Sequence, residues 1–159
     1  MLLLPLVGAN NHSPQKLVNS NTRANDYSPL KSIKTEFFMP HSPAFLKIVN
    51  VAKAQIKELT IADVVAKKSR GDIFHFVDTR EDNEWAKGHA QGAIHLGKGI
   101  IERDIEATIS DKNADIVLYC GGGFRSALVA EALQKMGYTN VSSMDGGWRG
   151  WCEAGLPIE

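Results

Sequence analysis

The chain has 159 residues, and its 18 lysine and arginine residues balance 18 aspartate and glutamate residues, so the formal net charge is zero. This length allows one compact domain with a tail, and a hydrophobic content of 43% supplies a core, which argues against global disorder. The charge balance disfavours binding to nucleic acid or to a membrane surface, no apolar run approaches the ~20 residues that cross a bilayer, and two cysteines make no disulfide scaffold.

The N-terminal segment differs from the rest of the chain. Its first 38 residues hold three of the six prolines and show neither helical nor strand periodicity. We therefore expect residues 1–42 to form a disordered extension, with Met39 as an alternative start. A secretory signal is the competing interpretation of the apolar run at residues 2–7, but the first basic residue is Lys16, and signal peptides begin with positive charge. We expect a cytoplasmic protein.

Regular spacing of apolar residues begins near Pro43. It predicts a helix there, with five apolar residues facing the core: Phe45, Ile48, Val49, Ala52 and Ile56. The pattern then predicts a strand over 57–59, a helix over 60–68 capped by Thr60 and ended near Gly71, a buried strand over 73–77, a short helix over 81–87, a strand over 93–96 and a helix over 100–109.

The clearest unit lies in the C-terminal third. A continuous apolar strand over 116–119 leads into a loop over 120–125, and Ser126 opens a helix that Gly137 closes. The apolar stripe of this helix comprises Leu128, Val129, Ala132, Leu133 and Met136. A strand over 141–144 and a terminal helix from Gly146 complete the chain. Alternating strands and helices predict one α/β domain over 43–159, with a mainly parallel sheet flanked by helices.

The loop that follows the apolar strand carries the strongest chemical signal. Cys120 lies at the carboxyl end of a strand and directly before a helix, where unpaired N–H groups and the helix dipole favour a thiolate. The guanidinium of Arg125 should lower the cysteine pKa further. Three glycines, Gly121 to Gly123, let successive N–H groups point inward and form an anion cradle. A structural cysteine before a flexible turn is the alternative, but it explains fewer of these features.

These residues resemble the active-site loop of single-domain rhodanese-type sulfurtransferases. The resemblance covers most of residues 57–159 and includes the family's motifs in order: Asp78-Thr79-Arg80-Glu81, Gly88-His89 followed by Gly92-Ala93-Ile94, Gly137-Tyr138 with Val141, and Gly146-Gly147-Trp148 with Trp151. Ala90-Gln91 departs from the Ile-Pro that is usual in the family, and the first 38 residues have no counterpart there.

The resemblance implies a rhodanese-like three-layer sandwich and a two-step sulfur transfer without a metal or an organic cofactor. The Cys120 thiolate would take sulfane sulfur from thiosulfate or a related anionic donor, and cyanide, a cellular thiol or a protein acceptor would remove it. Cys120 is then the catalytic residue, and the substrate-binding residues are Gly121, Gly122, Gly123, Phe124, Arg125 and Ser126, whose main-chain N–H groups would stabilise the persulfide.

Two alternative functions stay open. A rhodanese-like module can bind partners or carry sulfur without turnover, although this chain keeps both Cys120 and Arg125. A cysteine-dependent phosphatase or arsenate reductase is disfavoured, because such enzymes place five residues between cysteine and arginine and this loop places four. The shorter loop should fit a single sulfur better than a tetrahedral oxyanion.

Weaker signals come from single residues. Asp78 is a candidate partner of the loop, although a structural ion pair or cap is favoured for it and an ion pair for Arg80. Arg103 is a candidate for attracting an anionic donor at the pocket mouth, with a solvated helix face as an equal alternative. Four further residues are expected to have structural roles: Cys152 as a small packed residue, His75 as an interior or edge histidine, and Trp148 and Trp151 as helix-packing residues. His89 and His95 lack ligands at metal-binding spacing.

Overall fold

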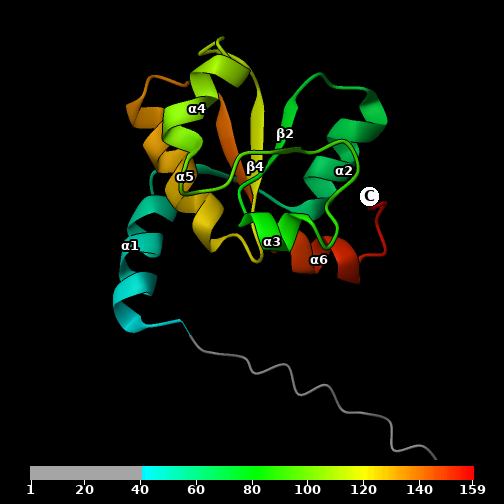
Figure 1. Ribbon diagram of the computed structural model, residues 1–159, viewed down its shortest axis with the longest axis horizontal. Coiled ribbons are helices and arrows are strands. Elements are labelled where there is room, and N and C mark those ends of the chain that lie inside the picture. Colours follow the sequence, from blue (N-terminus) through cyan, green and yellow to red (C-terminus); the bar gives the residue numbers. More distant parts are fainter. Residues whose placement is uncertain (1–40) are drawn as a thin grey trace, which may run out of the picture. The chain divides into compact units, whose positions relative to one another are not determined.

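The computed structural model describes residues 41–159 (Figure 1). The expected disordered extension and the alternative start at Met39 lie almost wholly outside the described residues and stay predictions. The helices are α1 (Pro43–Lys53), α2 (Ile61–Arg70), α3 (Asp82–Trp85), α4 (Ile101–Thr108), α5 (Phe124–Lys135) and α6 (Gly147–Glu153). The strands are β1 (Lys57–Leu59), β2 (His75–Asp78), β3 (Ile94–His95), β4 (Ile116–Tyr119) and β5 (Val141–Met144).

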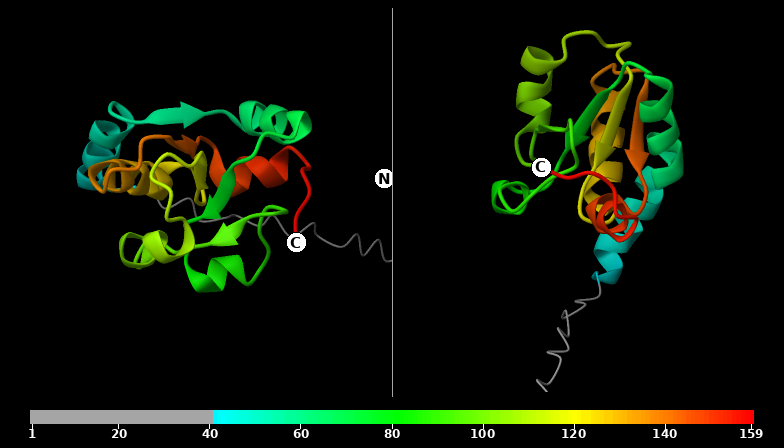
Figure 2. Two further views of the ribbon diagram at one scale, coloured as in Figure 1. Left: turned by 90° about the horizontal axis from the view of Figure 1, so that it is seen from above. Right: turned by 90° about the vertical axis from the view of Figure 1, so that its right-hand side faces the viewer.

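The strands of the described domain form one parallel sheet in the order β1-β5-β4-β2-β3. Helices cover both faces, as Figure 2 shows. Ile105 of α4 and Leu133 of α5 belong to the core on one face, whereas Val64 of α2 and Trp151 of α6 belong to the core on the other. Helix α1 packs against α5. The predicted three-layer α/β sandwich with a parallel central sheet is therefore confirmed.

Local signals placed most elements correctly. The Thr60 hydroxyl accepts the Asp63 N–H at 3.1 Å while the Asp63 carboxylate accepts the Thr60 N–H, so the predicted cap of α2 is a reciprocal capping box. Gly71 ends that helix in the left-handed conformation, with φ of 73°. Helix α5, however, begins at Phe124 instead of Ser126, because Gly123 takes a left-handed φ of 89° and forms its N-cap.

Two predictions of burial are wrong. Helix α1 packs on α5, and that contact buries Val49 and Ala52. Ile48 lies outside the contact and is 54% exposed. The strand predicted over 73–77 begins only at His75, which pairs with Ile116, the first residue of β4. Ile73 therefore extends beyond its neighbour strand and is 96% exposed. His75, predicted as an interior or edge histidine, is the exposed first residue of β2.

The parallel arrangement brings three strand ends to one edge of the sheet. Strand β2 continues toward α3, β4 continues into Cys120 and α5, and β5 continues into α6. Because β4 lies between β5 and β2, the Cys120 loop has a neighbouring strand end on each side. This edge is where ligands bind in open α/β sheets.

Candidate active site

Cys120 lies directly after the central strand and is only 1% exposed. The Ser126 hydroxyl donates to its sulfur at 3.6 Å, and the main-chain N–H groups of Gly122 and Ser126 also point at the sulfur. Burial raises the pKa of the thiol, but these three donors and the positive charge of Arg125 outweigh burial, so the pKa lies below its ordinary value. Two N–H groups of the loop therefore help to lower the thiol pKa, and binding of an anion by the loop stays a prediction.

Helix α6 holds the outer side of the loop. The N–H of Trp148 donates to the Cys120 carbonyl at 2.7 Å, and the N–H of Arg149 donates to the Gly121 carbonyl at 3.1 Å. These bonds hold the loop carbonyls toward α6 and away from the sulfur. The N–H groups of the loop can therefore face the sulfur. Gly147 permits this contact, because a Cβ there would lie 2.3 Å from the Cys120 carbonyl oxygen. Gly147 was predicted only as part of a family motif and of the start of the terminal helix, and Arg149 was not predicted to contact the loop.

Arg125 forms an ion pair that the sequence analysis did not anticipate. Its two terminal nitrogens donate to the Glu84 carboxylate of α3 at 2.6 and 2.9 Å, and Glu81 lies 3.5 Å away. The hydrogen bonds from Arg125 lower the pKa of Glu84, and the hydrogen bonds to Glu84 raise the pKa of Arg125. No local pattern connects the two residues, since they are 41 positions apart and meet only through the strand order.

Asp78 and Arg80 form a separate buried ion pair at the end of β2. Their side chains are 0% and 3% exposed, and the Arg80 Nη2 donates to the carboxylate at 2.6 Å. Arg80 also donates to the Gly88 carbonyl at 2.8 Å and lies over the Trp148 ring. This geometry fits the structural alternative for both residues, and a binding role for Asp78 stays an untested prediction.

Arg103 lies on α4 with a side chain that is 74% exposed. Its guanidinium donates to the carboxylate of the adjacent Asp104 at 2.6 and 2.8 Å. No contact connects it to the Cys120 loop within the described part of the chain, so its role in attracting a donor also stays a prediction.

Phe124 extends from the loop toward α1. Its ring centre lies 4.5 Å from that of His41 and 6.4 Å from that of Phe45, and the Lys53 ammonium lies 5.7 Å from it. Lys53 also contacts Glu58 at 2.7 Å and Asp145 at 3.1 Å. Helix α1 therefore covers the side of the loop at which α5 begins.

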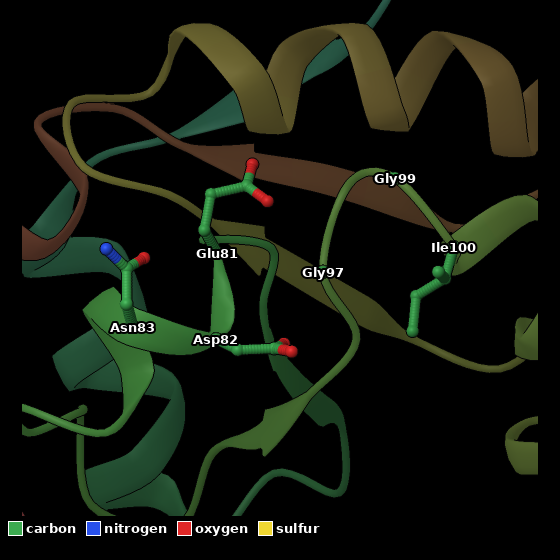
Figure 3. Close-up of a pocket in the computed structure, with 6 residues that line it drawn as sticks. All are labelled: Glu81, Asp82, Asn83, Gly97, Gly99 and Ile100. Carbon is green, nitrogen blue, oxygen red and sulfur yellow. The ribbon is translucent and has the colours of Figure 1, made fainter.

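A cavity of about 390 Å³ lies beside this site and is drawn in Figure 3. It lies between the start of α3 and the loop before α4, and its lining is Glu81, Asp82, Asn83, Gly97, Gly99 and Ile100. Glu81 connects it to the site, because the same carboxylate lies 3.5 Å from Arg125. Its charged lining is acidic.

The remaining candidates have structural environments. Trp151 of α6 is 1% exposed and belongs to the core on the face of the sheet that α2 also covers, which confirms its packing role. His89 and His95 stack on the Trp85 ring, with ring centres 3.3 and 4.9 Å away. Cys152 is exposed, so the prediction that it is packed is wrong: it faces outward on α6 while Trp151 takes the buried position.

Two features are absent from residues 41–159. No cluster of three or more His, Cys, Asp or Glu side chains is placed to hold a metal ion in that range. None of the helices found there combines the length and apolarity that crossing a membrane requires.

Known proteins resemble this chain in sequence and in fold. The family model described as the rhodanese-like domain matches residues 60–154. The thiosulfate sulfurtransferase GlpE of Haemophilus influenzae is 37% identical over 103 residues, which cover 65% of this chain and 94% of that protein. The thiosulfate sulfurtransferase PspE of Escherichia coli is 33% identical over 72 residues, 45% of this chain and 69% of that protein.

A solved structure from Rhodopseudomonas palustris is 32% identical with a TM-score of 0.68, and the match covers 76% of this chain and 99% of that one. It is described as a protein of unknown function and a possible tyrosine phosphatase. The matched family model spans more than half of the chain and contains the Cys120 loop, α3 and all of α6. The protein belongs to the rhodanese-like domain family.

Proposed function

We propose that the protein is a sulfurtransferase that moves sulfane sulfur from thiosulfate or a related donor to a thiophilic acceptor through a persulfide on Cys120. The observation that carries this proposal is the environment of the Cys120 sulfur, which receives one hydroxyl and two main-chain donors in a buried position. The sequence relatives named thiosulfate sulfurtransferases support the choice of donor.

The first step is attack by the Cys120 thiolate on the outer sulfur of thiosulfate. A bond forms between the two sulfurs, the sulfur–sulfur bond of thiosulfate breaks, and sulfite leaves with the electron pair. The product, Cys–S–S⁻, carries its negative charge one atom further from the strand end. The N–H groups of Gly122 and Ser126 support this step, because donors aimed at a sulfur anion also stabilise a persulfide anion nearby.

The second step returns the thiolate. A cyanide ion or a thiolate acceptor attacks the outer sulfur, the persulfide bond breaks, and its electron pair returns to Cys120. Thiocyanate or an acceptor persulfide leaves. No metal or redox cofactor is needed for this balance, because the sulfur transferred keeps its oxidation level between donor and acceptor.

The role of Arg125 in this scheme follows from its ion pair. Both of its terminal nitrogens already donate to Glu84, so a thiosulfate anion would have to displace or share that carboxylate. We therefore assign Arg125 to holding α3 against the loop and to favouring the thiolate, and we assign the first contact with the donor to the main-chain N–H groups.

A phosphatase or arsenate reductase is the competing reaction for a cysteine in such a loop. The possible tyrosine phosphatase description of the Rhodopseudomonas palustris protein keeps it relevant. Four residues separate Cys120 from Arg125, and two of the loop donors converge on the sulfur itself. This loop is one residue shorter than those that hold a phosphate, which favours transfer of a single sulfur atom.

The test is to mix the protein with thiosulfate and measure its intact mass. We expect the mass of one added sulfur, its removal by cyanide with formation of thiocyanate, and no addition in Cys120→Ser. Cys152→Ser is the matched control and should load sulfur normally. An unchanged mass would refute the proposal, and phosphate release from an aryl phosphate without sulfur loading would replace it. A persulfide that forms once but is not turned over would identify a sulfur carrier.

A further inference from the structure

A second serine lies behind the serine that contacts the candidate nucleophile. Ser143 belongs to β5, is 0% exposed, and has its Oγ 2.8 Å from the Oγ of Ser126, which is also 0% exposed. Ser126 Oγ in turn lies 3.6 Å from the Cys120 sulfur. Three buried side chains from β5, α5 and the end of β4 therefore form one chain of contacts.

The direction of the two hydrogen bonds follows from counting protons. Each serine hydroxyl has one proton. Ser126 donates its proton to the Cys120 sulfur, so the bond between the serines has Ser143 as donor. The reverse direction would leave the sulfur without its hydroxyl donor. It would also leave the Ser143 proton unpaired in the protein interior, since Ser126 is the one side-chain partner that the described residues offer it.

We propose that Ser143 is a positioning residue of the active site, whose hydroxyl donates to Ser126 and so commits the Ser126 proton to the sulfur of Cys120. A serine in the first turns of a helix otherwise tends to return its proton to a carbonyl three or four residues earlier. For Ser126 those carbonyls belong to the loop, at Gly122 and Gly123. The bond from Ser143 orients the Ser126 oxygen and polarises its hydroxyl toward the sulfur.

The adjacent Ser142 provides a matched control. It is 1% exposed and occupies the preceding position of the same strand, so its side chain points to the opposite face of the sheet. Its hydroxyl has no hydrogen-bond partner among residues 41–159. Ser142→Ala and Ser143→Ala each remove one buried hydroxyl from β5. Only Ser143→Ala interrupts the chain of donors that leads to the sulfur.

The charged groups around Cys120 come from several elements. Arg125 of α5 acts on the sulfur through its positive charge, and Glu84 and Glu81 of α3 pair with Arg125. Arg149 of α6 lies against Gly121 and Gly122 on the outer side of the loop. His41, which precedes α1, and Lys53, the last residue of α1, contact the Phe124 ring. Alanine at 143 alters none of these charges. A shift in the pKa of Cys120 would therefore come from the loss of the Ser143–Ser126 hydrogen bond.

The experiment is an ultraviolet titration of the thiolate in full-length protein carrying Cys152→Ser, with the Cys120→Ser form subtracted. We expect Ser126→Ala to raise the pKa of Cys120 by about one unit, since a hydrogen bond to a charged group is lost. Ser143→Ala should raise it by about a third of that amount, because Ser126 then divides its proton between sulfur and carbonyl. Ser142→Ala should leave it unchanged.

A double-mutant cycle completes the test. In the Ser126→Ala background, Ser143→Ala should add no further shift, because its path to the sulfur is already interrupted. An equal shift in both backgrounds, or equal values for alanine at 142 and 143, would overturn the proposal. Should Ser143→Ala fail to fold, Ser143→Cys replaces it with the same expected direction, since a thiol is a weaker donor of similar size. The form that carries both Ser143→Cys and Cys120→Ser is then the one subtracted, so that the new thiol does not contribute to the signal.

The inference rests on the proposed function for its biological meaning, but its readout does not. If Cys120 titrates as expected and the protein takes no sulfur from thiosulfate, the sulfurtransferase proposal fails and the role of Ser143 stands. If sulfur loads normally and alanine at 143 leaves the titration unchanged, the role of Ser143 fails and the proposed function stands.

Discussion

The two cysteines of this chain have opposite properties, although helix α6 contains one and contacts the loop of the other. Cys120 belongs to the loop that the first turn of α6 contacts, and it is 1% exposed. Hydrogen bonds and the charge of Arg125 lower its pKa despite burial. Cys152, in the last turn of α6, is exposed, yet partial burial of its thiol and the nearby Glu153 raise its pKa. Directed donors therefore matter more than solvent access in deciding which sulfur carries negative charge.

The largest expected effect comes from removing the contact between α6 and the loop. A Cβ in Gly147→Ala would lie 2.3 Å from the Cys120 carbonyl oxygen and 2.8 Å from the Gly122 nitrogen, so the loop must move. We expect the pKa of Cys120 to rise toward that of an ordinary thiol and sulfur loading from thiosulfate to fall about tenfold or more. Thiolate titration and intact mass measure both quantities.

Two glycine variants control this prediction. Gly155→Ala carries the same backbone penalty, with φ of 64°, but its Cβ meets nothing within 4 Å. Gly71, at the end of α2, has a left-handed φ of 73°, and the Cβ of Gly71→Ala also meets nothing within 4 Å. Both should keep most of the loading. A Gly147→Ala protein that titrates like the parent would show that α6 does not shape the loop.

An intermediate effect should appear in the pH dependence of alkylation. The reactive form is the thiolate, so a thiol with a lowered pKa keeps its reactive fraction to lower pH. In Cys152→Ser, which retains Cys120, the midpoint of the rate profile should lie below the ordinary cysteine value of about 8.5, and in Cys120→Ser it should lie above. Midpoints are compared instead of absolute rates, because burial slows access to Cys120. Coincident midpoints would remove the distinction between the two thiols.

The smallest effect concerns the carboxylate that pairs with Arg125. Glu84→Gln removes the closer of the two carboxylates beside Arg125 and leaves Glu81 at 3.5 Å, which should lower the pKa of Cys120 slightly further and reduce the free energy of unfolding by about 1 kcal/mol or less at neutral pH. The Glu84 pKa is depressed in the folded protein, so its stabilisation is present above the unfolded value of about 4.3 and is lost as pH falls through the folded value.

Denaturant unfolding of the parent and of Glu84→Gln at about pH 7 and about pH 3 measures this difference. The two proteins should converge in acid. A gap that persists there would mean that Glu84 contributes through packing and not through its charge.

Much of the fold could be predicted from local sequence patterns. Hydrophobic periodicity and helix caps located the elements to within about two residues, as at Thr60, where one hydroxyl and one carboxylate define the start of α2. The errors at Ile48 and Ile73 have one cause. Periodicity indicates which residues share a face, but the length of the neighbouring strand or the width of a helix contact decides how much of that face is covered.

The nucleophile candidate was also accessible, because a strand, a cysteine, three glycines and a helix occur consecutively in the chain. The residues that surround this loop could not be predicted from the sequence. Arg149 and Gly147 approach the loop from α6, Glu84 approaches Arg125 from α3, and Ser143 approaches Ser126 from β5. None of these residues has a spacing pattern that relates it to Cys120.

The amino-acid sequence alone determined the α/β class, the order of the elements, and the placement of a cysteine between a strand end and a helix start. These properties depend on hydrogen bonding and side-chain periodicity within a few residues. Only the tertiary structure decided which groups surround the sulfur and how far each charge is neutralised. The reason is that strand order brings distant segments to one sheet edge, and the free energy that selects this order comes from burying the whole core.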